Sequence, residues 1–221
     1  IIPNIFFGIR EKKETGRTGQ WKSTRQVLDE IYGILFGIRF PRDISATLRN
    51  AIMTLPEGAS IFQVGFMIPR KTEVIRLVVT SLPRDAMTRY LSDIGWPDDT
   101  NVAGELSGRL TTIFDRIVYN INIGRSVLPF LGMELYLGKL SQPQHDPRWT
   151  RVMDQLVSDG LLLETKREAL LRFCGKRTIQ LLYPIRYICG INHLKFVYRK
   201  GIPNEVKGYF GTMIRPDIIN Q

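Results

Sequence analysis

The alternation of apolar and polar residues predicts three β-hairpins along the chain. Apolar residues occupy every second position over 61–68 and 74–80, over 117–123 and 131–137, and over 193–199 and 205–211. Successive side chains of a strand point to opposite faces, so each strand has one apolar and one polar side. We place the first turn at 69–72, where Pro69 begins it, and the last over 200–204.

Apolar residues at helical spacing predict a pair of helices before each hairpin. The patterns cover 23–35 and 48–55, then 83–94 and 106–114, then 146–157 and 165–173. Ser23 with Gln26 and Thr165 with Glu168 have the spacing of capping boxes. We interpret Asp98 and Asp99 as a turn and helix cap, and residues 11–19 as an exposed loop within a partly mobile N-terminal segment, 1–22.

The order of these elements predicts one α+β domain over 1–221. Repeated ββαα units would form an antiparallel sheet or barrel, with the helices on its outer apolar face. No stretch of the sequence has the composition of a linker. We therefore expect the polar sides of the strands to share one second face.

That second face is the candidate site. It is interpreted either as a binding surface or as the solvated side of an antiparallel sheet, which is common. Cations, amides, a carboxylate and tyrosine hydroxyls together suit an oxyanion with an aromatic or amide partner. Its predicted members are Arg76, Asn120, Asn122, Glu134, Tyr136, His193, Lys195, Arg199, Lys207 and Tyr209.

Charge and composition limit the chemical classes of binding partner that we expect. Lys and Arg number 31 against 21 Asp and Glu, a net charge of +10 that favours nucleic acid, phosphorylated small molecules or acidic peptides. Charged residues interrupt every apolar run before the roughly 20 residues needed to span a bilayer, so we expect no membrane insertion. No basic leader precedes the apolar N-terminal stretch, and we expect a cytoplasmic protein. Cys174 and Cys189 are expected to be reduced and buried.

The last hairpin carries Lys207-Gly208-Tyr209, a Lys-x-Tyr element on a strand that follows a Pro/Gly turn. With the repeated strand and helix pairs, it resembles the aromatic prenyltransferases of the ABBA (PT-barrel) class, which includes dimethylallyltryptophan synthases and cyanobactin peptide prenyltransferases. The resemblance implies a ten-stranded barrel whose inward cations and tyrosines hold a prenyl diphosphate. Prenyl diphosphate would be a co-substrate, no resident cofactor or metal is expected, and Mg²⁺ would be compatible but not required.

The resemblance also implies roles for individual residues. Glu134 would be the catalytic carboxylate that engages the acceptor, although the family's glutamate lies earlier in the chain. The expected activity is alkylation of an aromatic or peptide acceptor. Diphosphate binding would fall to Arg76, Lys195, Lys207 and Tyr209, and acceptor binding to Asn120, Asn122, Tyr136 and His193.

Two other functions stay open at this point. A nucleic-acid-binding module would use the basic sheet face and would lose affinity steeply with salt. The predicted polar side carries few aromatic residues for base stacking, which counts against it. A non-catalytic peptide-binding protein is the third possibility. A closed lumen would favour the transferase, and a flat sheet the other two.

Overall fold

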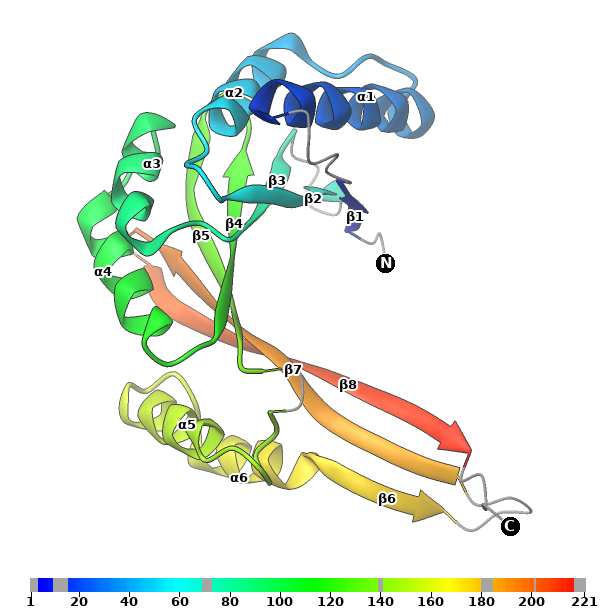
Figure 1. The fold of residues 1–221 in the computed structure, drawn as a ribbon, viewed down its shortest axis with the longest axis vertical. Coiled ribbons are helices and arrows are strands. Elements are labelled where there is room, and N and C mark those ends of the chain that lie inside the picture. The colour runs from blue at the N-terminus through cyan, green and yellow to red at the C-terminus, as the bar shows by residue number, and fades with distance from the viewer. Residues whose placement is uncertain are drawn as a thin grey trace.

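The computed structural model describes residues 4–9, 16–68, 73–138, 141–179, 185–200 and 202–216. Within these ranges the chain forms an α+β fold with one eight-stranded antiparallel sheet and six α-helices (Figure 1). The strands are β1 (Ile5–Gly8), β2 (Ser60–Phe66), β3 (Ile75–Thr80), β4 (Arg116–Ile123), β5 (Val127–Tyr136), β6 (Gly175–Ile179), β7 (Ile185–Arg199) and β8 (Ile202–Pro216).

The sheet is open. Its strand order is β1-β2-β3-β4-β5-β7-β6, and β8 pairs with the other edge of β7. The long strand β7 pairs with β5 through residues 194–198 and with β6 through residues 185–189. A barrel requires pairing that returns to the first strand. Among the described strands no pairing joins β1 to β8, so the barrel alternative is not observed.

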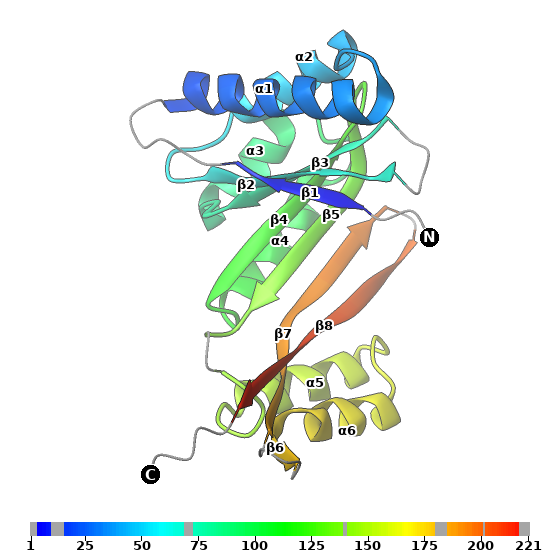
Figure 2. The same ribbon diagram turned by 90° about the vertical axis from the view of Figure 1, so that its right-hand side faces the viewer.

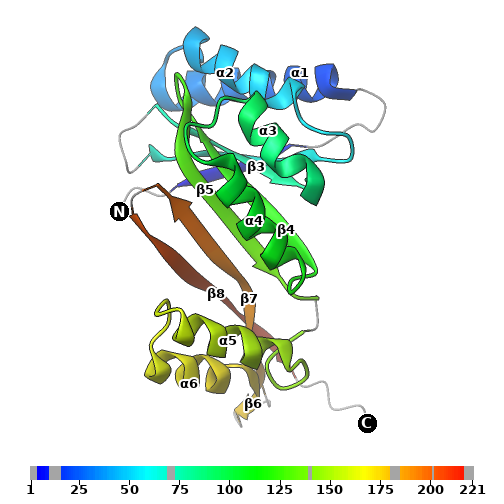
Figure 3. The same cartoon turned by 90° about the vertical axis from the view of Figure 1, so that its left-hand side faces the viewer.

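The helices gather on one side of the sheet. Figure 2 shows strands in front with α3 to α5 behind them, and Figure 3 shows these helices from the opposite direction. None of the helices in the described ranges combines the length and apolar character needed to cross a bilayer. They are α1 (Gly16–Phe36), α2 (Arg42–Met53), α3 (Met87–Asp93), α4 (Thr100–Thr111), α5 (Arg148–Ser158) and α6 (Glu164–Phe173), with a short 3₁₀ turn, η2 (Arg84–Ala86).

The core fills the space between these helices and the apolar sides of the strands. Leu77, Ile121 and Met133 from three neighbouring strands are fully buried, as are Leu48 of α2 and Trp149 of α5. Removal of such side chains from water is the main favourable term in folding. The apolar columns predicted for β3, β4 and β5 therefore face the helices, and the polar columns face away.

Of the register shifts within the described strands, those in β2 and in the middle of β7 bear most on the predicted alternation. The register of β2 shifts between Ile61 and Gln63, so Phe62 is 51% exposed while Ile61 is buried. The alternation over 61–68 predicts that Phe62 shares an apolar column with Val64 and Phe66. For Phe62 this prediction was wrong, because an extra residue reverses which side the preceding positions face. The register of β7 shifts in the same way between Ile191 and His193, which leaves Asn192 as the extra residue.

Several element ends differ from their predictions. Ser23 lies inside α1, which begins at Gly16, and α6 has Leu163 at its N-cap with no side-chain cap, so both capping boxes were wrong. The cap at Asp99 is confirmed, since its carboxylate accepts from the N–H groups of Asn101 and Val102 at 2.9 and 3.2 Å. The predicted turn at 69–72 and residues 11–15 of the predicted loop lie outside the described residues.

The two cysteines are both free thiols, but only one is fully buried. Cys174, at the end of α6, is buried, whereas Cys189 on β7 is half-buried and lies 3.8 Å from Thr212 Oγ1. The expectation that both are buried is therefore right for Cys174 alone. Cys189 falls on the part of β7 that pairs with β6 and β8, where no helix covers the strands as closely as it does near β4 and β5 (Figure 1).

Candidate functional site

The strand register brings the predicted site residues together on the side of the sheet away from the helices. Glu134 on β5 lies opposite Lys195 on β7, and Lys195 lies opposite Lys207 on β8. In the neighbouring row, His193 lies opposite Tyr209. We call this side the polar face. Its members used below are Arg76, Arg116, Asn120, Asn122, Phe130, Gly132, Glu134, Tyr136, His193, Lys195, Arg199, Glu205, Lys207 and Tyr209.

Lys195 is the centre of a buried network. Only 5% of the residue is exposed, and its ammonium donates to Asn120 Oδ1 at 2.7 Å and to Glu134 Oε1 at 3.2 Å. A Cβ at Gly132 would lie 2.9 Å from Lys195 Cε and 3.2 Å from Asn120 Cβ. The glycine therefore leaves the room in which the lysine side chain crosses β5 to reach Asn120 on β4.

Glu134 is held by three donors. Its Oε1 accepts from Asn120 Nδ2 at 3.1 Å as well as from Lys195, and its Oε2 accepts from the Tyr136 hydroxyl at 3.1 Å. Burial raises the pKa of Glu134, but the charge and hydrogen bond of Lys195 and the bond from Asn120 outweigh it and hold that pKa below its usual value. Burial lowers the pKa of Lys195 to about 8, although Glu134 opposes the shift.

An aromatic stack borders this network. The His193 ring lies between Tyr209, at 4.3 Å and 12° between planes, and Tyr136, at 4.8 Å. The Arg116 guanidinium covers the other side of the Tyr136 ring at 4.1 Å. Burial, followed by the charge of Glu134, raises the pKa of Tyr136 to about 12. Burial also lowers the pKa of His193, and the charges of Lys195 and Arg116 add to that effect against Glu134.

A second cationic cluster lies at the β3 end of the polar face. Arg76 is buried and donates from Nε to Asn122 Oδ1 at 2.9 Å. Its guanidinium lies 4.4 Å from the centre of the Phe130 ring, and that of Arg199 lies 5.2 Å from the same centre. Such contacts stabilise a cation electrostatically. One phenylalanine thus holds two arginines that belong to strands far apart in the sequence.

Every predicted site residue lies on the polar face. Lys207 and Tyr209 are more exposed than the others, and the Lys207 ammonium pairs with Glu205 Oε1 at 3.2 Å. The sequence interpretation missed Arg116, Phe130 and Gly132, although Phe130 and Gly132 share the odd–even phase of Glu134 on β5. Five cations and two carboxylates among the members of the face leave it a net positive charge.

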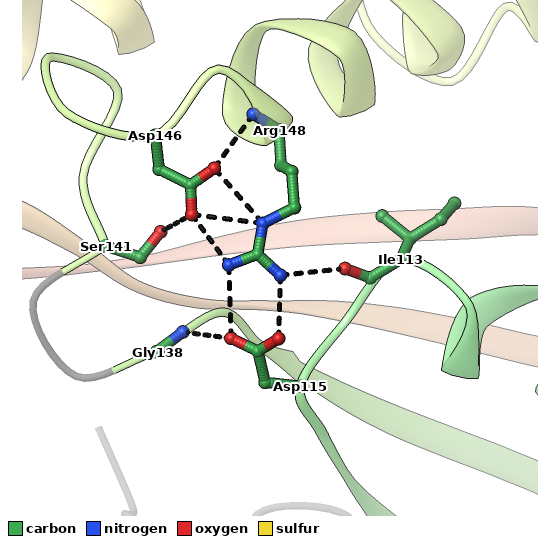
Figure 4. Close-up of polar contacts among 6 residues, drawn as sticks. All are labelled: Ile113, Asp115, Gly138, Ser141, Asp146 and Arg148. Atoms are coloured by element: carbon green, nitrogen blue, oxygen red, sulfur yellow. Dashed lines mark hydrogen bonds and ion pairs between the residues drawn. The ribbon is translucent and has the colours of Figure 1, made fainter.

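A separate ionic network joins the start of α5 to the start of β4. Figure 4 shows Arg148 between two carboxylates, with its Nη1 2.7 Å from Asp115 Oδ1 and its Nη2 2.7 Å from Asp146 Oδ2. The Ser141 hydroxyl donates to Asp146 at 2.7 Å, and the Gly138 N–H donates to Asp115 at 2.7 Å. Hydrogen bonds from Arg148 hold the pKa of both carboxyls below their usual range. We interpret this network as structural, because one guanidinium satisfies both carboxylates.

The helix side of the sheet has its own hollow. A groove of about 830 Å³ lies between α4 and α5, with Leu135, Leu194 and Phe196 among its lining residues. These side chains point to the face opposite Glu134 and Lys195, so the sheet separates the groove from the polar face. Within the described ranges, no three His, Cys, Asp or Glu side chains come together as metal ligands would. No protein-family model, curated protein or solved structure matches this chain.

Proposed function

We propose that the polar face binds the diphosphate of a prenyl substrate and that the protein transfers the prenyl group to an aromatic or peptide acceptor. The observation that supports this proposal most is the gathering of Arg76, Lys195, Arg199 and Lys207 around amides and aromatic rings on one face. Charge-assisted hydrogen bonds to phosphate oxygens are stronger than neutral ones. Donors fixed before the reaction also stabilise charge as it develops on a leaving group.

The chemistry follows from these groups. The bond between the allylic carbon and the diphosphate oxygen breaks, and the diphosphate keeps the electron pair. The allylic carbon then forms a bond to the acceptor, which releases a proton. Cations at the diphosphate stabilise its departure. The face of Tyr209 turned away from His193 suits the allylic cation, whereas the rings of Phe130 and Tyr136 already contact arginines.

Glu134 takes the acceptor's proton in this proposal. Its three donors reduce its basicity, as the lowered pKa indicates. A weak base is sufficient, because an aromatic ring that has just been alkylated at carbon is a strong acid. Asn122 supplies an amide beside this position for the acceptor, whereas Asn120 orients the base, because its amide binds both Glu134 and Lys195.

The repeated-unit fold belongs to the same proposal. Two helix pairs directly precede a hairpin: α1 and α2 precede β2 and β3, and α3 and α4 precede β4 and β5. The strand β6 separates the third pair, α5 and α6, from the hairpin of β7 and β8. The first two units support the succession of helix and strand pairs that the resemblance to PT barrels implies. The described sheet would supply one wall of such a site.

Calorimetric titration with dimethylallyl and geranyl diphosphate tests the proposal. We expect binding by the wild type and a loss of about tenfold or more in affinity in Lys207→Ala, the size of one charge-assisted contact. Lys22→Ala removes an exposed lysine on α1, away from the polar face, and is the matched control. The absence of binding by the wild type, or an unchanged affinity in Lys207→Ala, contradicts the proposal.

Nucleic-acid binding is the second candidate, and two observations favour it. The sheet is open, so an extended polyanion has access to the polar face. Phe130 also adds a ring to the two tyrosines, Tyr136 and Tyr209, that the sequence interpretation had placed on this face. Fluorescence anisotropy with single-stranded RNA and DNA at increasing salt distinguishes the two. Steeply salt-dependent binding together with no affinity for either diphosphate would support this candidate instead.

A further inference from the structure

The imidazole of His193 is fixed in place. Tyr209 stacks on one side of the ring and Tyr136 lies on the other, while the Tyr136 hydroxyl is itself bound to Glu134. Only 8% of His193 is exposed. Rotation out of this stack would break both ring contacts, so the plane of the imidazole is fixed.

The two nitrogens have different surroundings. Of the pair, only Nδ1 is both buried and without a hydrogen-bond partner among the described residues. A proton on Nδ1 would therefore be a buried donor with no acceptor, and folded proteins contain fewer such orphaned N–H groups than under-satisfied acceptors. In the neutral ring the proton consequently belongs on Nε2.

Burial is the main effect that opposes a second proton on the ring and lowers the pKa of His193. The cations Lys195 and Arg116 act in the same direction, and the carboxylate of Glu134 opposes them without reversing the shift. The adjacent tyrosines are neutral at ordinary pH. Burial lowers the pKa of the imidazole because it disfavours any charged ring.

We infer that His193 is a neutral hydrogen-bond donor that binds a phosphate oxygen of the ligand through Nε2–H. This inference rests on the proposed diphosphate site and moves His193 from acceptor binding to phosphate binding. A neutral donor lets the face hold a diphosphate with one cation fewer. It also keeps that contact constant across the pH range in which a free histidine titrates.

Nitrogen-15 spectra of the histidine rings test the inference without any ligand. The chain has two histidines, and His145→Gln assigns the other set of signals. We expect the Nε2–H tautomer for His193 and a neutral ring at about pH 6, half a unit below the ordinary pKa of histidine. An Nδ1–H tautomer, or an imidazolium at neutral pH, overturns the inference.

Pyrophosphate binding tests the functional half. His193→Gln keeps an N–H donor near the Nε2 position, and His193→Leu removes it. We expect pyrophosphate affinity to fall about tenfold or more in His193→Leu and much less in His193→Gln. Wild-type binding that His193→Leu leaves unchanged overturns the inference and leaves the diphosphate site standing. No pyrophosphate binding by the wild type overturns both.

Discussion

Lys195 shows how a single residue organises the polar face. A buried ammonium is costly unless it is paired and hydrogen-bonded, and here Asn120 and Glu134 provide both. The stem of the lysine lies over Gly132, where no side chain competes for the space. Lys207 sits directly opposite on β8 but stays half-exposed, with Glu205 as its partner.

These two lysines therefore predict different losses of stability. Lys195→Ala leaves the Glu134 carboxylate, whose side chain is 19% exposed, without its cation, and we expect the free energy of unfolding to fall by about 2–4 kcal/mol. Lys207→Ala removes an exposed pair and should cost no more than about 1 kcal/mol. Urea unfolding of both variants measures the difference. Equal losses would mean that the Lys195 pair contributes nothing beyond a surface contact.

Much of the polar face could be predicted at the residue scale. Alternation alone assigned Arg76, Glu134 and Lys195 to one side, because strand side chains have a strict period of two. The sequence interpretation did not assign Phe130 and Gly132 to the polar face, because it considered only polar side chains for that side. Phe62 was misassigned because a bulge leaves no mark in the pattern of apolar residues.

Among the elements, β7 is unusual because two strands share one of its edges. β5 ends its pairing at Leu194 and β6 begins at Cys189, which leaves Ile191 between them. The Gln142 side chain fills this gap: its Nε2 donates to the Ile191 carbonyl at 2.9 Å, and its Oε1 accepts from the Ile191 N–H at 2.8 Å. A side-chain amide thus replaces a missing strand residue.

We expect Gln142→Ala to weaken this junction. Both backbone groups of Ile191 would lose their partners, at a cost of about 1–3 kcal/mol, with water able to recover part of it. Hydrogen exchange of the Ile191 amide should accelerate strongly. Gln155→Ala, on the exposed side of α5, is the control and should leave that amide unchanged. Unaltered protection of Ile191 in Gln142→Ala would show that the side chain does not secure the strand.

The three hairpins and six helices were recognisable in the sequence, whereas β1 and β6 were not. β6 is five residues long, and four of them are exposed, so it has no buried column to produce alternation. β1 is shorter still. Short strands are defined by backbone pairing with a neighbour, and that pairing depends on residues more than fifty positions away in the case of β1 and β2.

For the whole molecule, the network around Arg148 joins the β4–β5 hairpin to the α5–α6 pair (Figure 4). Asp115 comes from the turn that enters β4, and Asp146 from the loop that enters α5. Both carboxyls have a pKa below their usual range because of Arg148. The attachment of one part of the fold to the other is therefore sensitive to protonation.

This network predicts part of the acid sensitivity. The unfolded chain binds protons at Asp115 and Asp146 near pH 4, at a higher pH than the folded protein does. Their stabilisation is thus complete above that pH and is lost as the pH falls toward the folded-state pKa values. In Arg148→Ala we expect lower stability at about pH 6 and a smaller further loss at about pH 3. Urea unfolding across this range, with Arg151→Ala as control, measures the slopes; parallel curves would contradict the prediction.

Closure of the sheet lay beyond what the sequence could predict. The period-two pattern is the same in a barrel wall and in an open sheet, because both have one covered side. What separates them is whether the two outermost strands meet, and no residue of β1 or β8 reports on that locally. The period-two pattern distinguishes the two sides of each strand, so it predicted helices on one side and polar groups on the other. It carries no information on whether the outermost strands pair, so it could not predict closure.

The bulge at Asn192 has a consequence for variation in this chain. Downstream of it, odd-numbered residues such as His193 and Lys195 belong to the polar face; upstream, odd-numbered Ile191 and Cys189 face the helices instead. The one extra residue thus exchanges the faces to which odd- and even-numbered side chains of β7 point. A substitution of Asn192 keeps this exchange of faces, whereas its deletion would move the side chains on one side of the bulge to the opposite face of the sheet.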